Sequence, residues 1–260
     1  HTGTVGVDRA VPIREKNPLN KFGLFRSAKD RLKLPVSAYL IEHPKGKILI
    51  DTGWPEKYAD QQPQWPLDKI STPKLTKEES VKSHLARLDL KPDDLDAIYL
   101  SHLDFDHTAG LSDLTEAKAF YTSKPEKEAL KTHLLRYQKD TFDFVPLQTF
   151  EYEKSGIGPV GESYDVFKDG SVLLVHTPGH TNGLFTVMIK GKDGKYILLP
   201  GDAVYLQPSI RNKYLPGYAM SIPQARASVD WIHQCSLDPN CMLIAPNHDP
   251  SVQEQTIVLA

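Results

Sequence analysis

The sequence predicts an α/β fold arranged in layers, with β-sheets inside and helices outside. Strand hairpins and helices occur once in each half of the chain, and polar loops end several of the apolar strands. We find no linker, low-complexity tract or short-period repeat that would divide the sequence. Because elements of this kind bury their apolar faces against one another, we expect a single domain over residues 1–260.

The N-terminal part of the chain predicts mainly strands. Residues 4–13 form a weak strand, and residues 17–25 form a loop with more apolar and aromatic side chains than a plain connector needs. Residues 36–42 and 47–51 are expected to pair as a hairpin, because the turn-forming segment Pro44-Lys45-Gly46 lies between them.

Residues 54–73 predict a long loop, since they contain four prolines and two tryptophans without periodicity. A loop of this length is either a lid over a site or a surface excursion. A helix follows, opened by a capping box of Thr76 and Glu79 and ended before Pro92. It leads to a buried strand at residues 97–100, which runs directly into a polar stretch.

The rest of the chain continues this mixture of strands and helices. Residues 119–121 form a short strand, a helix begins at Ser123 with Pro125 in its first turn, and residues 142–166 are expected to be irregular. The remaining elements are strands at residues 171–176 and 242–245, a hairpin of residues 184–189 and 195–199, and a helix at residues 221–234.

The composition argues against two classes of partner. With 31 basic and 33 acidic residues the net charge is close to zero, and no long Lys/Arg run is present, so we do not expect a nucleic acid partner. No apolar stretch approaches the roughly 20 residues that cross a bilayer, so we do not expect a membrane partner either.

Cysteine usage indicates a cytoplasmic protein. Cys235 and Cys241 are expected to be buried thiols rather than a structural disulfide. Residues 1–7 lack the positive and apolar regions of a signal peptide. Since the chain does not begin with methionine, we expect its start to be trimmed, and a preceding targeting segment stays open.

Four potential metal ligands, His102, Asp104, Asp106 and His107, lie within six residues just after the strand at residues 97–100. Imidazole nitrogens and carboxylate oxygens suit Zn, Mn or Fe, and the crowded negative charge favours a bound cation. The alternative is a polar loop in which His102 and Asp106 cap the following helix.

Three later loops that end apolar strands add His180, Asp202 and His248. Each is a weak signal alone, since a histidine after Pro-Gly and a Gly-Asp pair are common in turns. Together with the first cluster, they provide the about seven donors that a two-metal site needs. Asp202 is the natural bridge, because one carboxylate can bind two cations.

The order His-x-Asp-x-Asp-His, then His, then Gly-Asp, then His resembles the metallo-β-lactamase superfamily. The resemblance implies a four-layer αβ/βα sandwich, in which two mixed β-sheets are flanked by helices, and it agrees with the layered prediction. It also implies a role for each ligand. His102, Asp104 and His180 would hold the first metal ion, Asp106, His107 and His248 the second, and Asp202 would bridge them.

Within that superfamily the chain is most similar to the N-acyl homoserine lactonase group. The resemblance covers most of the chain, from residues 34–36 and 48–53 through residues 91–95 to residues 247–249. In Gly-Asp-Ala-Val-Tyr, Tyr205 stands where those lactonases carry a tyrosine that contacts the substrate carbonyl. The alternative for Tyr205 is a half-buried core tyrosine.

The resemblance implies a dinuclear metal hydrolase that opens a lactone, or cleaves a related ester, in a small-molecule substrate. A metal-bound hydroxide would attack a carbonyl polarised by the first metal and by Tyr205, and Asp106 would take up a proton from the collapsing intermediate. The alternatives are a phosphodiesterase or thioesterase of the superfamily, a diiron redox protein, and a binding module with a relict site.

Asp104 departs from the family pattern His-x-His-x-Asp-His, which has a histidine at that position. A carboxylate adds negative charge and a harder oxygen donor, which should lower the Lewis acidity of the first metal and favour Mn or Fe relative to Zn. We therefore expect two divalent ions, zinc first, with manganese or iron as the alternatives. Flavodiiron-type proteins also have a carboxylate there, so the redox alternative stays open.

Substrate preference is expected to come from residues 22–25, 54–65 and 205–220, which could line an apolar cleft, pack on the core or form a homodimer contact. Asp51 is expected either to orient a site residue or to cap its own turn. The remaining histidines are interpreted as structural: His43, His84, His133, His176 and His233.

Overall fold

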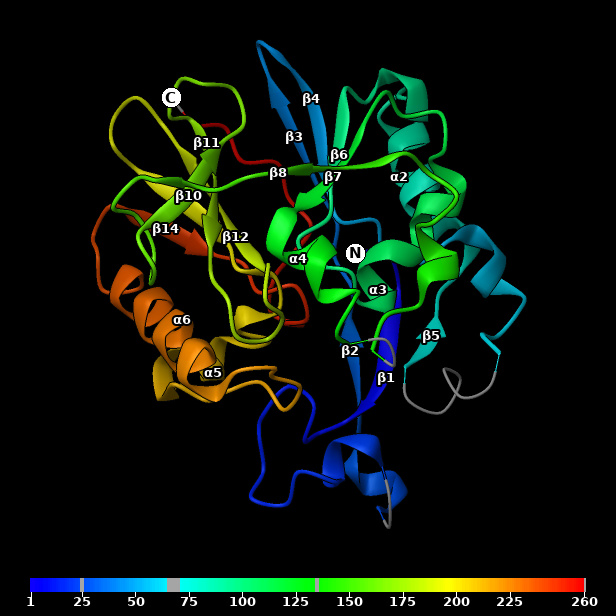
Figure 1. Cartoon of the computed structure of the whole chain (residues 1–260). Coiled ribbons are helices and arrows are strands. Elements are labelled where there is room, and N and C mark those ends of the chain that lie inside the picture. Colours follow the sequence, from blue (N-terminus) through cyan, green and yellow to red (C-terminus); the bar gives the residue numbers. More distant parts are fainter. Residues whose placement is uncertain (24–25, 65–70, 134–135, 260) are drawn as a thin grey trace. The chain divides into compact units, whose positions relative to one another are not determined.

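The computed structural model describes the chain except for residues 24–25, 65–70, 134–135 and 260 (Figure 1). The backbone clusters into two compact units, which we call unit 1 (residues 1–8 and 22–149) and unit 2 (residues 9–21 and 150–260). Each unit contains one mixed β-sheet together with helices, so the predicted α/β class is confirmed. A single domain over residues 1–260 stays a prediction.

The main sheet of unit 1 has five strands in the order β3-β4-β6-β7-β8. Strands β3 and β4 are antiparallel, whereas β6 runs parallel to both β4 and β7. The strands are β3 Tyr39–His43, β4 Gly46–Ile50, β6 Ala97–Tyr99, β7 Phe120–Ser123 and β8 Leu147–Phe150. A smaller antiparallel sheet has the order β2-β1-β5, with β1 Thr4–Asp8, β2 Arg31–Pro35 and β5 Thr72–Lys74.

Short helices complete unit 1. The predicted hairpin and capping box are both confirmed: β3 and β4 pair with Tyr39 opposite Ile50, and the backbone N–H of Thr76 donates to the Glu79 carboxylate at 2.7 Å. The α-helices are α2 Val81–Arg87, α3 Phe105–Thr108 and α4 Lys124–Ala129. The 3₁₀ turns are η2 Ala28–Asp30, η3 Glu56–Ala59, η4 Lys77–Glu79, η5 Pro92–Asp94, η6 Ala109–Asp113 and η7 Lys139–Thr141. A further 3₁₀ turn, η1 Asn20–Phe22, has its first two residues in unit 2 and its last in unit 1.

Trp54, the first residue of the long predicted loop, belongs to the core of unit 1 rather than to a lid. Its side chain is fully buried, its ring centroid lies 5.1 Å from that of Phe105, and its indole N–H donates to the Thr4 carbonyl at 3.1 Å. Trp65, the other tryptophan of that loop, lies outside the described residues.

Unit 2 is built on a six-stranded sheet of order β14-β13-β12-β11-β10-β9, in which only the β13–β14 pair is parallel among the described pairings. The strands are β9 Glu153–Lys154, β10 Glu162–Asp165, β11 Val172–His176, β12 Phe185–Lys190, β13 Tyr196–Leu199 and β14 Cys241–Ile244. The helices are α5 Gln207–Asn212 and α6 Ile222–Cys235, with the 3₁₀ turn η8 Gly201–Ala203.

Helix α6 covers one face of this sheet. It begins after Ser221, whose hydroxyl accepts a hydrogen bond from the backbone of Gln224, and it has a proline in its first turn as predicted. One side of the helix is apolar and packs with alternate residues of β11 and β13. The packed cluster includes Val175, Leu198, Ala225, Val229 and Ile232. This core fixes the ends of the strands from which the polar loops leave.

Residues 142–166 were expected to be irregular, and this prediction is wrong. They contain β8, β9 and β10, which are short and carry polar side chains at many positions. Pairing rather than residue pattern defines them, as in β10, where Ser163 lies opposite Val175 of β11. Strand β2 and helix α5 were not predicted either.

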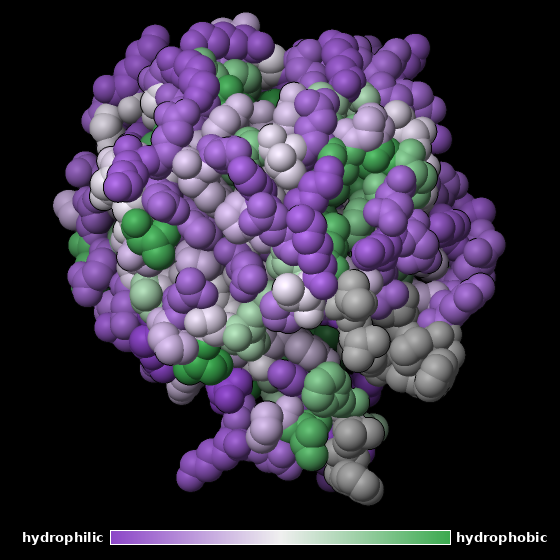
Figure 2. Space-filling view, viewed as in Figure 1, coloured by the Kyte–Doolittle hydropathy of each residue, from purple (hydrophilic) through white to green (hydrophobic). Residues whose placement is uncertain are grey.

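The two cysteines are free thiols, as predicted. Cys235 is buried and Cys241 is half-buried. Burial, together with the neighbouring Cys235 thiol, raises the pKa of Cys241 to about 11. Among the described residues, no helix combines the length and the hydropathy that crossing a bilayer demands. Hydrophilic side chains cover most of the molecular face in Figure 2, with apolar groups between them.

Candidate metal centre

The polar loop that follows β6 places the first predicted ligands in unit 1. His102 and His107 are fully buried, whereas the Asp104 and Asp106 side chains are 20% and 15% exposed. Helix α3 begins after Asp104, and the Asp104 carboxylate makes no capping hydrogen bond. Neither His102 nor Asp106 occupies the cap position, so the interpretation of these two residues as helix caps is wrong.

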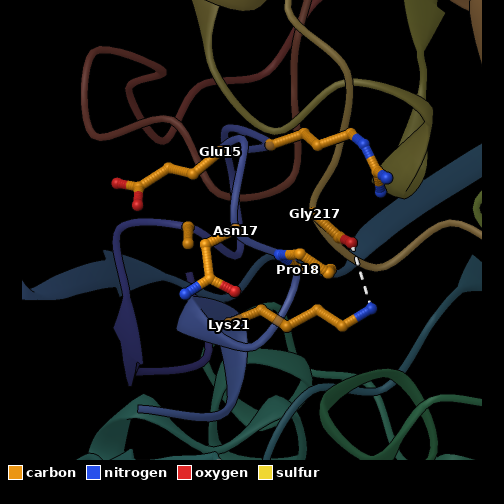
Figure 3. Close-up of a pocket in the computed structure, with 7 residues that line it drawn as sticks. Glu15, Asn17, Pro18, Lys21 and Gly217 are labelled. Carbon is orange, nitrogen blue, oxygen red and sulfur yellow. Dashed lines mark hydrogen bonds between the residues drawn. The ribbon is translucent and has the colours of Figure 1, made fainter. Parts of the chain in front are cut away.

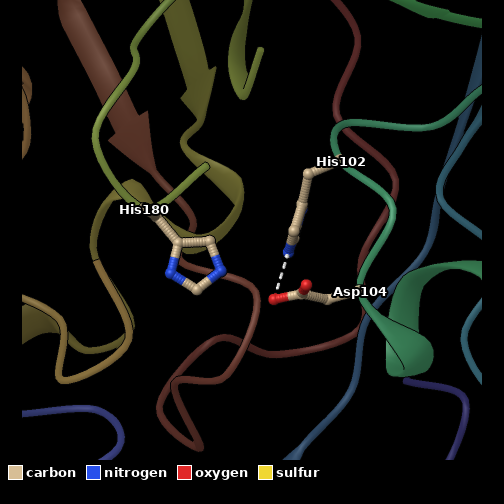
Figure 4. A group of neighbouring side chains, drawn as sticks. All are labelled: His102, Asp104 and His180. Carbon is tan, nitrogen blue, oxygen red and sulfur yellow. Dashed lines mark ion pairs between the residues drawn. The ribbon is translucent and has the colours of Figure 1, made fainter. Parts of the chain in front are cut away.

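Each histidine of this loop directs its Nε2 atom towards a motif carboxylate. His102 Nε2 lies 3.5 Å from Asp104 Oδ2, and Figure 4 shows the carboxylate turned towards that ring. His107 Nε2 lies 4.0 Å from Asp106 Oδ2. The two imidazole rings are close, with centroids 4.0 Å apart. Four nitrogen and oxygen donors therefore converge at one end of α3.

Asp51, at the end of β4, fixes this loop from behind. Its carboxylate accepts hydrogen bonds from the Ser101 backbone N–H and hydroxyl, each at 2.7 Å, and lies 2.8 Å from His107 Nδ1. Asp51 is almost fully buried and has a φ of 57°, a left-handed conformation that aspartate tolerates better than most residues. Asp51 therefore contacts the predicted ligand His107, as the expected orienting role requires.

In unit 2, three strand-end loops bring His180, Asp202 and His248 together. His180 Nε2 lies 3.5 Å from Asp202 Oδ2, and His248 Nε2 lies 3.2 Å from Asp202 Oδ1. All three side chains are buried. Each oxygen of Asp202 thus faces a different histidine.

These distances fit metal coordination better than direct hydrogen bonding. Two donor atoms that share a tetrahedral metal at ordinary bond lengths lie about 3.4 Å apart. The four Nε2–carboxylate distances run from 3.2 to 4.0 Å, whereas the hydrogen bond of His107 Nδ1 to Asp51 is 2.8 Å long. The donor chemistry and spacing of both units therefore suit divalent ions.

His180 is oriented by a loop that the N-terminal segment of unit 2 supports. His180 Nδ1 lies 2.5 Å from the Tyr218 carbonyl, which fixes the ring with Nε2 towards Asp202. Lys21 Nζ donates to the Gly217 carbonyl at 3.4 Å, in the pocket of Figure 3, and its cation lies over the Tyr218 ring. A Cβ on Gly217 would lie 1.8 Å from the Ala10 carbonyl, so the close approach requires glycine.

Tyr205 lies beside two of the predicted ligands. Its ring stacks on His248, with centroids 4.9 Å apart and an interplanar angle of 17°, and it meets His180 edge-on at 5.9 Å. The side chain is only 5% exposed. This buried position beside His180 and His248 agrees with both roles considered for Tyr205, a substrate contact and a core tyrosine.

Arg136 is a residue of this region that the sequence did not reveal. It donates to both oxygens of Asp104, with Nε–Oδ1 at 2.7 Å and Nη2–Oδ2 at 2.5 Å. The one available signal was indirect, because a carboxylate in place of a neutral histidine calls for a counter-ion. No motif connects the two positions, which are 32 residues apart.

Comparison with protein families identifies similar sequences. The family model of the metallo-beta-lactamase superfamily matches residues 31–236. The N-acyl homoserine lactonase AttM of Rhizobium radiobacter is 25% identical over 233 residues, which are 84% of this chain and 83% of that protein. The N-acyl homoserine lactonase AiiA of Bacillus thuringiensis subsp. kurstaki is 30% identical over 185 residues, 70% of this chain and 69% of that protein.

Solved structures of the same kind share the fold. An N-acyl homoserine lactone hydrolase, with the product N-hexanoyl-L-homoserine bound at its catalytic metal center, superposes with a TM-score of 0.75 and 25% identity. The match covers 96% of this chain and 91% of that one. A quorum-quenching N-acyl homoserine lactone hydrolase gives a TM-score of 0.73 at 26% identity, covering 96% of this chain and 90% of that one.

The hydrogen bonds of Asp51 predict a measurable effect on metal binding. Asp51→Asn keeps the size of the side chain and tolerates the left-handed backbone, but an amide cannot accept from Ser101 and His107 with both of its atoms. We expect metal affinity to fall roughly 10- to 100-fold, as is usual when a group behind a ligand is lost. Competition with a chromophoric chelator measures it.

Asp96→Asn is the matched control, because Asp96 also accepts a backbone hydrogen bond, from Lys47 at 2.8 Å, but orients no histidine. Its metal affinity should equal that of the unmodified protein. An equal loss in both variants, or no loss in Asp51→Asn, would contradict the assigned role of Asp51.

Proposed function

The chain belongs to the metallo-β-lactamase superfamily, and we propose that it is a dinuclear metal-dependent hydrolase that opens lactones of the N-acyl homoserine type. The observation that carries this proposal is the set of four histidines whose Nε2 atoms each face a motif carboxylate. The kinship with N-acyl homoserine lactonases indicates the substrate class.

The proposed ligand set combines donors of both units. His102, Asp104 and His180 would hold the first ion, Asp106, His107 and His248 would hold the second, and Asp202 would bind both. The geometry within unit 2 supports the bridging role, since Asp202 Oδ2 faces His180 and Asp202 Oδ1 faces His248. These two histidines belong to different ions in the proposed set.

Zinc is the proposed metal, with manganese and iron as alternatives. When bound, two such ions polarise a carbonyl oxygen and make a nucleophile available from water near neutral pH. The histidines would bind through Nε2, because Nδ1 of His107 and of His180 is already engaged, by Asp51 and by the Tyr218 carbonyl. The chain thereby holds both rings in the orientation that metal binding requires.

Asp106 and Tyr205 are the proposed catalytic residues beyond the metal ligands. The Asp106 side chain is 15% exposed, so it can exchange a proton with substrate. We assign it the uptake of a proton released as the tetrahedral intermediate collapses. The Tyr205 hydroxyl is assigned to the substrate carbonyl, where a hydrogen bond stabilises the developing negative charge.

The segments proposed to recognise an acyl chain offer exposed apolar side chains in each unit. Phe22 of unit 1 is 44% exposed, and Tyr214 of unit 2 is 42% exposed. Residues 24–25 and 65, which belong to the same predicted segments, lie outside the described residues. A homodimer contact through these side chains and a cytoplasmic location also remain proposals.

The function is tested by a substrate panel combined with metal removal. Protein stripped with a chelator should lose homoserine lactone hydrolysis, and two equivalents of zinc should restore it, because the proposed nucleophile depends on the ions. Release of one proton per lactone opened, followed with a pH indicator, measures turnover. Thioesters, phosphodiesters and oxygen consumption with iron-loaded protein test the alternatives.

His180→Ala, which removes one first-metal ligand, is expected to lose activity under every metal condition. Lactone opening that persists after chelation would contradict the metal dependence. Turnover of phosphodiesters or thioesters without any lactone opening would replace the proposed substrate class while leaving the hydrolase class standing.

Tyr205→Phe separates the two roles considered for this residue. Loss of a hydrogen bond to a developing oxyanion is expected to lower kcat on the order of 100-fold, with metal content and thermal stability unchanged because the ring remains stacked on His248. Steady-state kinetics and metal analysis measure both. A normal kcat would make Tyr205 a core residue only.

A further inference from the structure

Asp104 is bound on two sides within unit 1. On one side His102 Nε2 lies 3.5 Å from Asp104 Oδ2. On the other, Arg136 forms a two-pronged ion pair with both oxygens, at 2.7 and 2.5 Å. Planar pairing of this kind fixes the position of a carboxylate as well as its charge.

Arg136 is largely buried beside Asp104. Its side chain is 17% exposed. The guanidinium of an arginine keeps its proton at every pH at which proteins are folded. The cation is therefore permanent, and removing its partner would leave a buried charge uncompensated.

The segment that carries Arg136 is fastened to the ligand loop at two further points. The Tyr137 hydroxyl donates to the buried Glu126 carboxylate at 3.0 Å, and that carboxylate accepts from the Leu103 backbone at 3.1 Å. The hydroxyls of Thr141 and Thr108 lie 2.6 Å apart. Hydrogen bonds thus connect residues 136–141 to both ends of the loop that contains Asp104 and His107.

The charge of Asp104 explains why a cation is needed beside it. An imidazole ligand is neutral, whereas a carboxylate carries one negative charge, so Asp104 alone would make the first metal site more negative than the family pattern does. One guanidinium cancels that charge. The Asp104–Arg136 pair has the net charge of a histidine, with an oxygen as the donor atom.

We propose that Arg136 is a positioning residue of the metal centre, and that the ion pair of Arg136 with Asp104 replaces a neutral histidine ligand as one unit. This inference rests on the proposed function, because it presumes that Asp104 binds the first metal. The pair keeps the charge of that site close to the family value, so it favours retention of zinc despite the carboxylate.

Exchange of the two residues, singly and together, tests the pair. Asp104→His installs the family ligand but leaves the Arg136 cation beside a dication. We expect one of the two zinc equivalents to bind roughly 10- to 100-fold more weakly, the range typical for loss of a group behind a ligand. Adding Arg136→Met removes the stranded cation, so the double variant should return to about threefold of the unmodified protein.

Zinc affinity and stoichiometry are measured by chelator competition on metal-free protein, and circular dichroism confirms that each variant is folded. The matched control is Arg26→Met. Arg26 makes a comparable two-pronged pair with Asp8, at 2.9 and 3.1 Å, and is 13% exposed, but Asp8 is not a proposed ligand. This variant should bind both zinc ions normally.

Three outcomes overturn the inference: normal binding by Asp104→His, a double variant as weak as that single variant, or an equal loss in Arg26→Met. If Asp104→His does not fold, the double variant decides alone, since weak zinc binding by a folded double variant contradicts the exchange. Failure of the unmodified protein to bind two zinc ions would instead refute the proposed function, so the two failures are distinguishable.

Discussion

Three carboxylates and four imidazoles of the candidate metal centre are held in or near the interior. The need to neutralise the negative charge of these carboxylates governs the structure around them. Asp202 is nearly inaccessible, and Asp104 and Asp106 are largely buried. Burying carboxylates is costly unless cations or hydrogen bonds compensate them. Two divalent ions meet most of that requirement in the proposed function, and Arg136 meets the part that Asp104 adds.

The two units orient their histidine rings in the same way. A buried strand ends, a polar loop leaves it, and a hydrogen bond to Nδ1 of one histidine in each unit directs its Nε2 atom towards a carboxylate. In unit 1 the hydrogen-bond partner is Asp51, which binds His107 Nδ1 and both donors of Ser101. In unit 2 it is the Tyr218 carbonyl behind His180. Rigid strands place the loops, and the hydrogen bonds fix the rings.

Local patterns in the sequence were enough to predict the elements that frame the site. The β3–β4 hairpin, the capping box at Thr76 and the helix after Ser221 each depend on residues a few positions apart, so the sequence alone predicts them. The seven proposed ligand positions were also visible, because each follows an apolar strand. The strand-end loops at His180, Asp202 and His248 became informative only together.

Features that depend on distant pairing could not be predicted. Strands β8, β9 and β10 are short and polar, and their neighbours in the sheet define them. Trp54 looks like a loop residue in the sequence, but it contacts Phe105, far along the chain, and lies in the core. Arg136 and the Tyr218 carbonyl act through contacts over many residues, and a backbone carbonyl leaves no trace in residue type.

The most direct test of the dinuclear centre is a crystal structure of the zinc-loaded protein, with anomalous diffraction recorded at the zinc edge. We predict two zinc peaks, with one oxygen of Asp202 on each, His102 and His180 on the first and His107 and His248 on the second. One peak, or two peaks that do not share Asp202, would contradict this prediction.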